Sequence, residues 1–411
     1  MSEEVEALRL ADEIFRLSSE ARGYVARGAH VTPLDKSTTL SRITGAEVYL
    51  KLENLQKTGS FKVRGPLFKL GRALEKGSVE GVVAASAGNH AQGVAYAASF
   101  YGLKSVIVMP ELAPPAKVKA TRSYGAEVVL HGRVVDEAFK LAEKIAEERG
   151  YMLVHPFDDL EIMAGNGTIA WEAYEQGGRF DTVIVPVGGG GLISGIVSVV
   201  RKLMPGVKVI GVEAEAAPKF VESFKEGKPI EVEVTHSLAD GLVTKKPGRL
   251  TYPIVKHLVD KVVAVDEHEI ASAMYLLLER SKILAEGAGA AGVAALLARV
   301  VKPKGKTLVI VSGGNADLTS IEKVILVGLA REGRIARITG VIPDIPGQLY
   351  KVLEVIAEKR CNVVDIIHDR LHPRISPGMA RVTIVLEVPE RMLLFELLED
   401  LRDMGYKFVI D

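Results

Sequence analysis

Short continuous runs of valine and isoleucine alternate with helical stretches from about residue 80 to residue 330. Continuous apolar runs, unlike runs in which apolar and polar residues alternate, indicate strands that are covered on both faces. Strands joined through helices form parallel sheets with helices on both sides. The predicted elements are strands 82–85, 105–109, 127–130, 182–187, 207–212 and 307–311, and helices 89–100, 114–124 and 134–149. The chain is therefore predicted to be an α/β protein with open twisted parallel sheets.

The pattern changes near residue 333, where residues 332–334 form a predicted linker. The elements predicted after it follow the order strand, helix, strand, strand, helix, strand, which is that of a ferredoxin-like βαββαβ unit. They are residues 335–342, 347–360, 362–369, 380–388, 390–404 and 407–410. We therefore expect a large body followed by a small C-terminal domain of residues 334–411.

The composition excludes several classes of protein. The 52 basic and 52 acidic residues leave no net charge, which argues against binding to nucleic acid. No stretch of about 18 apolar residues lacks charges, so no membrane span is expected. The single cysteine, Cys361, excludes a disulfide framework, and the acidic N-terminus lacks the apolar core of a signal peptide. We expect a cytoplasmic protein without nucleic-acid or membrane partners.

Three glycine-containing turns directly follow predicted strands, at residues 85–93, 187–195 and 311–315. Open α/β sheets bind ligands at the carboxyl ends of their parallel strands. In the second turn, four consecutive glycines (188–191) precede a helix, and their N–H groups together with the helix dipole can hold a phosphate. The turn is not a dinucleotide fingerprint, because that spacing needs glycine where Ser194 stands. A tight turn without a ligand is the alternative, but three such turns predict a site for a small phosphorylated molecule.

A further segment, residues 51–65 with Lys62, could by itself be a charged turn whose lysine lies in solvent. The segment closely resembles the lysine motif of the fold-type II pyridoxal-phosphate enzymes, the tryptophan-synthase-β-like family. The resemblance continues through the three glycine turns in the same order and covers residues from about 30 to 325. The C-terminal unit resembles an ACT domain, a regulatory module that binds amino acids. The combination is similar to threonine dehydratases with a single ACT domain.

The resemblance implies two open parallel-sheet domains followed by the ACT domain. The large pyridoxal-phosphate-binding domain would comprise residues 1–52 and 158–330, the small domain residues 53–157, and the ACT domain residues 334–411. Because ACT domains usually pair, the resemblance also implies a homo-oligomer, either a dimer or a tetramer.

The resemblance assigns roles to the matched residues. Lys62 would form the Schiff base with pyridoxal phosphate and later act as a base, which needs an amine that a desolvated pocket keeps neutral. The residues expected at the cofactor are Phe61 on the ring face, Asn89 at the phenolic oxygen, Gly188, Gly189, Gly190, Gly191 and Leu192 at the phosphate, Gly241 in the pocket wall and Ser312 at the ring nitrogen. The residues expected at the substrate carboxylate are Ser86, Ala87, Gly88 and His90. Asp240 and Glu286 also match family positions near the pocket.

The activity that the resemblance implies is the deamination of L-threonine to 2-oxobutanoate and ammonia. L-Serine would give pyruvate, because one methyl group is worth only about 1–3 kcal/mol of discrimination. Related racemases carry serine at the position of Ala87, so a dehydratase is favoured over a racemase. Serine dehydratase or racemase, threonine synthase and a β-replacement synthase stay open as alternatives, as does a non-catalytic amino-acid sensor.

No metal is predicted, although two acidic residues follow a strand. Glu213 and Glu215 stand where some relatives hold a cation. Lys219, however, occupies a place where another carboxylate would help to bind it.

A second ligand site is expected in the ACT-like unit. Gly347, Gln348 and Leu349 join a strand to a helix, and their N–H groups could hold the carboxylate of an amino-acid effector. Asn362 begins the next strand and could bind the polar end of the effector. A capped turn without a ligand is the alternative. The expected small-molecule partners are therefore an amino-acid substrate and an amino-acid effector.

Overall fold

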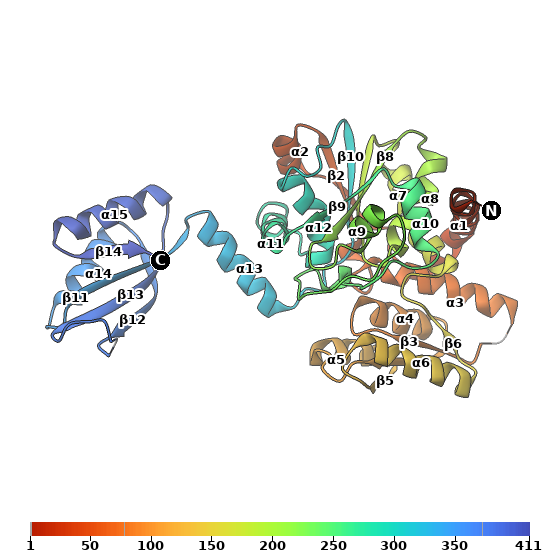
Figure 1. Cartoon of the computed structure of the whole chain (residues 1–411), viewed down its shortest axis with the longest axis horizontal. Helices are drawn as coiled ribbons and strands as arrows, with labels where there is room; N and C mark the ends of the chain where they lie inside the picture. The colour runs from red at the N-terminus through yellow and green to blue at the C-terminus, as the bar shows by residue number, and fades with distance from the viewer. Residues whose placement is uncertain (1, 78, 372) are drawn as a thin grey trace. The chain divides into compact units, whose positions relative to one another are not determined.

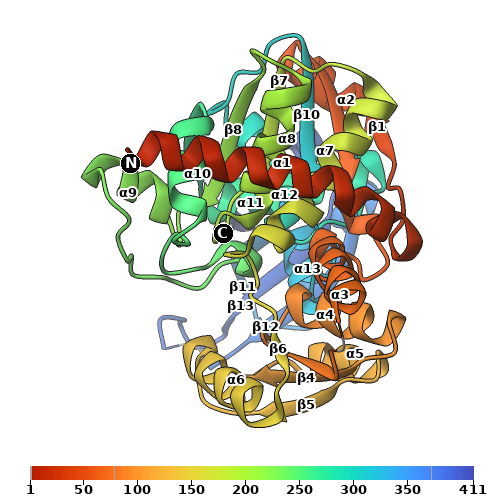
Figure 2. The ribbon, with the colours of Figure 1, turned by 90° about the vertical axis from the view of Figure 1, so that its right-hand side faces the viewer.

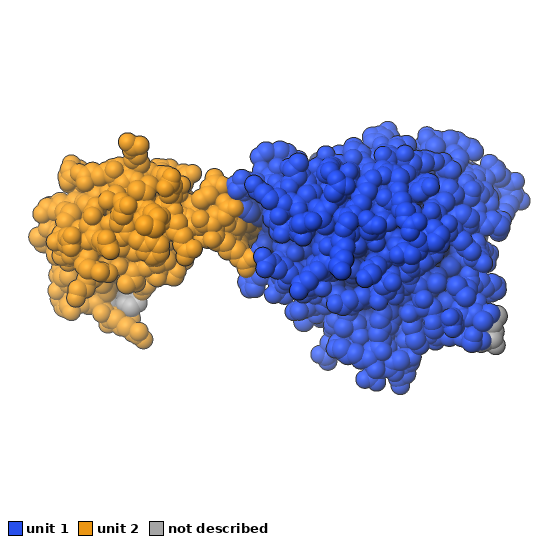
Figure 3. All heavy atoms as spheres, turned by 90° about the horizontal axis from the view of Figure 1, so that it is seen from above, with its two compact units in different colours: residues 1–317 blue, residues 318–411 orange. Residues whose placement is uncertain are grey.

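The structure is a computed structural model that describes residues 2–77, 79–371 and 373–411. It divides into two compact units, of which the first ends at Asp317 and the second comprises Leu318–Asp411 (Figure 3). No helix in the described part of the chain is both long enough and apolar enough to cross a membrane.

The first unit contains two sheets (Figure 1). The six strands of the larger sheet, in spatial order, are β1 (Leu34–Lys36), β2 (Glu47–Leu52), β10 (Lys306–Val311), β7 (Thr182–Pro186), β8 (Lys208–Ala214) and β9 (Lys261–Val265). The four strands of the smaller sheet are β5 (Glu127–Leu130), β4 (Lys104–Met109), β3 (Gly81–Ala85) and β6 (Met152–Leu153). Neighbouring strands are parallel throughout, except that β1 runs antiparallel to β2.

Helices cover both faces of the larger sheet. The helices on one face are α1 (Glu3–Gly28), α7 (Leu160–Gly177), α8 (Gly191–Leu203) and α10 (Thr251–Leu258), and Figure 2 shows α1 lying across the other three. Val183 and Val185 of β7 point into this apolar core. On the opposite face, α12 (Gly287–Leu297) approaches so closely that a Cβ atom at Gly292 would lie 2.7 Å from Val309 Cγ1. Continuous apolar runs in these strands are therefore explained by cover on both sides.

The smaller sheet is covered in the same way. Val82 and Ala84 of β3 pack with α3 (Arg64–Lys76) and α4 (Asn89–Phe100), whereas Val83 packs with α6 (Val135–Arg149). The other helical segments of the first unit are α2 (Thr38–Thr44), α5 (Pro115–Ser123), α9 (Lys219–Glu226), α11 (Glu267–Leu276), 3-10 turns at Glu53–Leu55, Phe61–Val63 and Asp240–Leu242, and a π-helical turn at Leu277–Ser281. The predicted α/β fold with open parallel sheets is confirmed.

The second unit begins with helix α13 (Leu318–Arg331). The elements that follow are β11 (Ile335–Pro343), α14 (Gln348–Glu358), β12 (Asn362–Asp369), β13 (Met379–Glu387), α15 (Arg391–Asp403) and β14 (Lys407–Ile410). This is the predicted βαββαβ order, and its antiparallel sheet has the order β12–β13–β11–β14. Residues 332–334 form the turn between α13 and β11, so the boundary between the units precedes the predicted linker.

Candidate active site

A cavity of about 990 Å³ lies at the carboxyl ends of strands from both sheets of the first unit. Its walls include the turns after β3, β7 and β10, which are the three glycine-containing turns of the sequence. The predicted site residues that line it are Phe61, Lys62, Ser86, Ala87, Gly88, Asn89, His90, Gly188, Gly189, Gly190, Gly191, Leu192, Gly241 and Ser312. The fold thus brings every residue expected at the cofactor or the substrate into one space.

The backbone around Lys62 is connected to the end of β10 and packs against α4. Phe61 N donates to Ser312 O at 3.1 Å, so the lysine segment lies beside the turn after β10. A Cβ atom at Gly93 of α4 would lie 2.5 Å from Lys62 O. Glycine at position 93 therefore lets the helix contact the backbone of Lys62 directly.

The Lys62 amine lies in the cavity wall with a backbone acceptor. Its Nζ donates to Pro156 O at 2.9 Å. Burial lowers the pKa of Lys62 to about 8, while the charge of Glu286 acts in the opposite direction. An amine with this pKa is neutral, and hence nucleophilic, far more often at neutral pH than an exposed lysine is.

A chain of hydrogen bonds orients Asn89. Its Nδ2 donates to Glu286 Oε1 at 2.7 Å, and its Oδ1 accepts from Asn315 Nδ2 at 2.8 Å. Asn315 Nδ2 also donates to Thr58 O at 2.7 Å. Burial, followed by the nearby charge of Asp240, raises the pKa of Glu286 to about 7. The cavity therefore holds a carboxyl group that can gain or lose a proton near neutral pH.

The turn after β3 presents backbone rather than a free imidazole. His90 is buried, and its Nε2 donates to Val154 O at 2.9 Å. Burial, together with the charge of Lys62, lowers the pKa of His90 to about 3, so the ring is neutral. The turn leads directly into α4, a helix of 12 residues whose N-terminal N–H groups and dipole favour a carboxylate.

The glycines of the four-glycine turn (188–191) are required by their surroundings. Gly190 has a φ of +98°, which favours glycine. In addition, there is no space for a side chain at Gly189, Gly190 or Gly191. A Cβ atom would lie 2.5 Å from the Phe157 ring at Gly189 and 2.7 Å from Phe157 O at Gly191. At Gly190 it would lie 2.7 Å from Thr251 Cβ. The turn therefore presents backbone without side chains to the cavity and opens α8, which suits a phosphate.

Two ion pairs connect opposite walls of the cavity. Lys117 of α5 pairs with Asp240 at 2.7 Å, and Lys245 pairs with Asp136 of α6 at 3.2 Å. All four residues line the cavity, and both carboxylates are largely exposed. These contacts join helices of the smaller sheet to the segment around the turn Asp240–Leu242.

Several residues around this site carry no motif of their own. Pro156, Phe157 and Thr251 contact the predicted residues from distant parts of the sequence. Asn315 belongs to the third glycine turn, but nothing in its spacing indicates that it orients Asn89. Contacts of this kind depend on tertiary packing, so sequence reasoning missed them.

The predicted effector residues lie at opposite ends of α14. Gly347 has a φ of +88° and precedes α14, and Gln348 Oε1 accepts from the Tyr406 hydroxyl at 2.6 Å. Leu349 lies in the first turn of the same helix, whereas Asn362 begins β12 beyond its other end. A helix of 11 residues spans about 16 Å.

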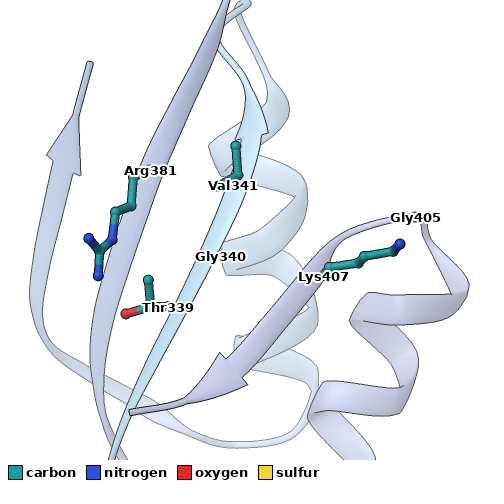
Figure 4. A pocket seen from close by; sticks show the side chains of 6 residues that line it. All are labelled: Thr339, Gly340, Val341, Arg381, Gly405 and Lys407. Atoms are coloured by element: carbon teal, nitrogen blue, oxygen red, sulfur yellow. The ribbon is translucent and has the colours of Figure 1, made fainter. Parts of the chain in front are cut away.

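A smaller hollow of about 410 Å³ lies elsewhere in the second unit (Figure 4). Its lining residues are Thr339, Gly340, Val341, Arg381, Gly405 and Lys407. Val341 and Arg381 are partners in the register of β11 and β13. The predicted effector residues are not among the six, so this hollow is separate from the turn before α14.

A comparison with protein families identifies the class of protein that this fold and site define. The profile of the family described as pyridoxal-phosphate dependent enzyme matches residues 25–313. The chain therefore belongs to the pyridoxal-phosphate-dependent enzymes, and the cofactor of this family is pyridoxal phosphate.

A curated relative shows which members of this family the chain is similar to. An L-threonine ammonia-lyase of Thermotoga maritima is 45% identical over 388 residues, which cover 94% of this chain and 97% of that protein. Because the first unit ends at residue 317, this match extends into the second unit.

Solved structures show the same fold in enzymes of two kinds. The processed form of threonine deaminase isoform 2 from Solanum lycopersicum has a TM-score of 0.72 and 33% identity, covering 76% of this chain and 87% of that one. A maize serine racemase has a TM-score of 0.72 and 34% identity, covering 77% of this chain and 98% of that one. The fold alone therefore does not separate a deaminase from a racemase.

Proposed function

We propose that this protein deaminates L-threonine to 2-oxobutanoate and ammonia, and L-serine to pyruvate and ammonia. The observation that carries the proposal is the single cavity that Lys62, the four-glycine turn and Ser312 line together. The choice of substrate is supported by the relative named L-threonine ammonia-lyase, which matches along nearly the whole chain.

The cavity fits pyridoxal phosphate at both ends of the cofactor. The four-glycine turn offers backbone N–H groups for the phosphate, with Leu192 beside them. Lys62 offers an amine of lowered pKa for the aldehyde. The proposed ring contacts are Phe61, Asn89, Gly241 and Ser312. When bound, pyridoxal phosphate delocalises the negative charge that develops on the substrate Cα.

The residues of the chain then position the substrate and move its protons. Ser86, Ala87, Gly88 and His90 form the turn that holds the substrate carboxylate at the N-terminus of α4. Lys62 Nζ removes the proton from the substrate Cα, and the β-hydroxyl leaves as water. One water is later added as ammonia is released, so threonine is converted to 2-oxobutanoate and ammonia without a net change in water.

Ala87 favours deamination over racemisation. A racemase needs a second group that exchanges a proton on the opposite face of the substrate Cα, and an alanine side chain has no such proton. Ser312 also favours prompt loss of the β-group, because a hydroxyl does not force the ring nitrogen to be protonated as a carboxylate would.

The test compares the products from two substrates. We expect the purified protein to form ammonia and 2-oxobutanoate from L-threonine and pyruvate from L-serine. Conversion of L-serine to D-serine as fast as pyruvate forms would contradict the proposal. The matched control is Lys62→Ala, which we expect to form none of these products.

A separate measurement tests the alternative of a non-catalytic sensor. Borohydride treatment of the holoenzyme should remove the visible absorbance band of the cofactor and leave the adduct on Lys62. Mass spectrometry of the digested protein locates that adduct, and its absence from Lys62 would favour the sensor.

We propose that the chain forms three domains. Residues 1–52 and 158–330 form the large domain and residues 53–157 the small one, and the cavity lies between their sheets. Residues 334–411 form the ACT domain. A reducing cytoplasm suits the one cysteine, Cys361, which is free and buried.

We also propose that an amino-acid effector binds the turn of Gly347, Gln348 and Leu349 on one chain and Asn362 on another. The two ends of α14 are too far apart to serve one small ligand within a chain. The protein is then at least a dimer. Calorimetric titration with isoleucine or valine, repeated with Asn362→Ala, tests the site, and light scattering tests the oligomeric state. A monomer with full effector affinity would contradict the proposal.

A further inference from the structure

The structure buries a lysine directly behind the four-glycine turn. Lys219 begins α9 and Glu213 lies on β8, and both side chains are fully buried. Lys219 Nζ lies 2.9 Å from Glu213 Oε1. Neither residue is among those that line the cavity, and the proposed proton transfers use neither.

Three backbone carbonyls complete the surroundings of the Lys219 amine. Its Nζ donates to Ala217 O at 3.0 Å and to Leu242 O at 3.1 Å. The third acceptor is Val187 O at 3.4 Å. An ammonium group has three hydrogens, and the three nearest of these four oxygen atoms are Glu213 Oε1, Ala217 O and Leu242 O. A single positive charge is thus surrounded by oxygen atoms.

These carbonyls belong to the segments that form the phosphate end of the cavity. Val187 directly precedes Gly188, and Leu242 directly follows Gly241. A Cβ atom at Gly188 would lie 2.9 Å from Gly241 O, so the two segments pack backbone against backbone. The Lys219 ammonium group therefore joins both segments from behind.

The Glu213 carboxylate is also fixed in place. It accepts hydrogen bonds from Phe220 N and Val221 N, each with an oxygen at 3.0 Å. A buried carboxylate needs a positive partner, and breaking such a pair leaves an uncompensated charge. Without Lys219, one carboxylate and three carbonyls would face an empty space, which is the kind of oxygen ligand set that binds hard cations.

We propose that Lys219 acts as an internal cation that holds the four-glycine turn in its phosphate-binding conformation. Its ammonium group replaces an exchangeable ion that would otherwise be drawn from solution. Lys219 is a positioning residue, because it acts on the cofactor only through the turn. The inference rests on the proposed cofactor site, and it predicts that cofactor affinity does not depend on dissolved cations.

Two substitutions at one position test the proposal. Lys219→Ala leaves the four oxygen ligands around a space, whereas Lys219→Met fills that space without a charge. The measurement is the dissociation constant of pyridoxal phosphate from the apoenzyme, followed by visible absorbance, together with the thermal midpoint. Each protein is measured in a tetramethylammonium buffer, and again with potassium, ammonium or calcium chloride at the same ionic strength.

We expect the wild-type dissociation constant to be the same in all of these salts. Lys219→Ala should weaken binding of pyridoxal phosphate by about 10- to 100-fold, which is the loss in affinity when a residue that orients the ligands of a metal site is removed. A small cation should restore most of that affinity. Lys219→Met should be weakened to a similar degree and should not recover.

Three results would overturn the proposal. These are a wild-type affinity that rises when a cation is added, a Lys219→Ala protein that binds like wild type, and a Lys219→Met protein that recovers with cations. The first needs no variant, so it applies even if a variant fails to fold. If Lys219→Ala folds only with a cation present, its folded fraction measures the rescue and supports the proposal. Wild-type apoenzyme that does not bind pyridoxal phosphate at all would overturn the proposed function, and this inference with it.

Discussion

At the scale of single residues, Lys62 illustrates how position changes chemistry. Its backbone is held by the hydrogen bond from Phe61 N and by the close approach of Gly93 of α4. Burial then lowers the pKa of the amine to about 8. The lowered pKa is therefore a consequence of where the fold places an ordinary lysine.

The lowered pKa of Lys62 predicts how fast the apoenzyme takes up its cofactor. An amine of pKa 8 is neutral in about one molecule in ten at pH 7, and its neutral fraction saturates above the pKa. We expect the rate of cofactor attachment to rise up to about pH 8 and then to level off. Stopped-flow absorbance measures this rate. The control is the rate at which pyridoxal phosphate reacts with a small amine of ordinary pKa, which reports ionisation of the cofactor itself. A rate of attachment to the protein that keeps rising to pH 10 would contradict the prediction.

Glu286 predicts a contrast between two substitutions. Glu286→Gln keeps an oxygen that accepts from Asn89 Nδ2 but removes a charge that raises the pKa of Lys62. We expect its attachment profile to move to lower pH while Asn89 keeps its orientation. Glu286→Ala removes the acceptor as well, so its kcat should fall further than that of Glu286→Gln. Equal kcat values for the two variants would show that the hydrogen bond to Asn89 has no role.

At the scale of elements, a buried ionic network connects the start of α3 to its neighbours. Arg64 donates to Glu53 and to Glu172 of α7, and Glu172 also pairs with Lys51 of β2 at 2.7 Å. Arg64 lies two residues after Lys62, so this network also anchors the backbone that follows the lysine.

The network predicts a difference between two glutamates on α7. Glu172→Gln leaves the buried Lys51 without its carboxylate partner and Arg64 with Glu53 alone, and it should cost about 3–5 kcal/mol in the free energy of unfolding. Glu175→Gln removes an exposed pair with Arg22 and should cost about 0–1 kcal/mol. Denaturant unfolding followed by circular dichroism measures both, and similar losses for both would contradict the assignment.

The stability lost in Glu172→Gln should depend on pH. The charges of Arg64 and Lys51 hold the pKa of Glu172 below its ordinary value of 4.5 in the folded chain. Its contribution to stability is therefore present above pH 4.5 and is lost as the pH falls through the folded pKa. The difference between wild type and Glu172→Gln should shrink in acid.

The elements also show what sequence reasoning could and could not predict. Strands with long apolar runs, such as β7 and β10, were predictable because burial on both faces leaves no polar alternation. Strands β9 and β6 were not predicted. The apolar run of β9 carries the same signal and could have been recognised, whereas β6 has only two residues and forms through its pairing with β3. In the site, Lys62 and the glycine turns carry recognisable motifs. The hydrogen bonds of Asn315 and Lys219 do not, because they join residues far apart in the chain.

At the scale of the whole molecule, the cavity and the proposed effector site lie in different units. The cavity is lined by residues numbered no higher than Ser312, and the first unit ends at Asp317. The second unit has a hydrophobic core of its own, which includes Ile338, Val382 and Leu397. Each unit therefore has the packing that independent folding requires.

This separation predicts the behaviour of a shortened chain. A protein that ends at Asp317 should bind pyridoxal phosphate and deaminate L-threonine with a kcat within about threefold of wild type, because no cavity residue is removed. Its response to isoleucine or valine should disappear. Steady-state kinetics with and without these amino acids measures both effects. A shortened chain that folds but is inactive would show that the second unit contributes to the site.

The charged groups in and behind the cavity wall differ in how far solvent reaches them, and this difference determines how salt acts on the site. Lys117–Asp240 and Lys245–Asp136 lie where solvent reaches them, so salt screens their attraction. Lys219 is shielded behind the turn, where mobile ions do not compete. Raising the ionic strength should therefore weaken these two ion pairs and hasten the exchange of small molecules, while the four-glycine turn, where we propose that the cofactor phosphate binds, keeps its shape.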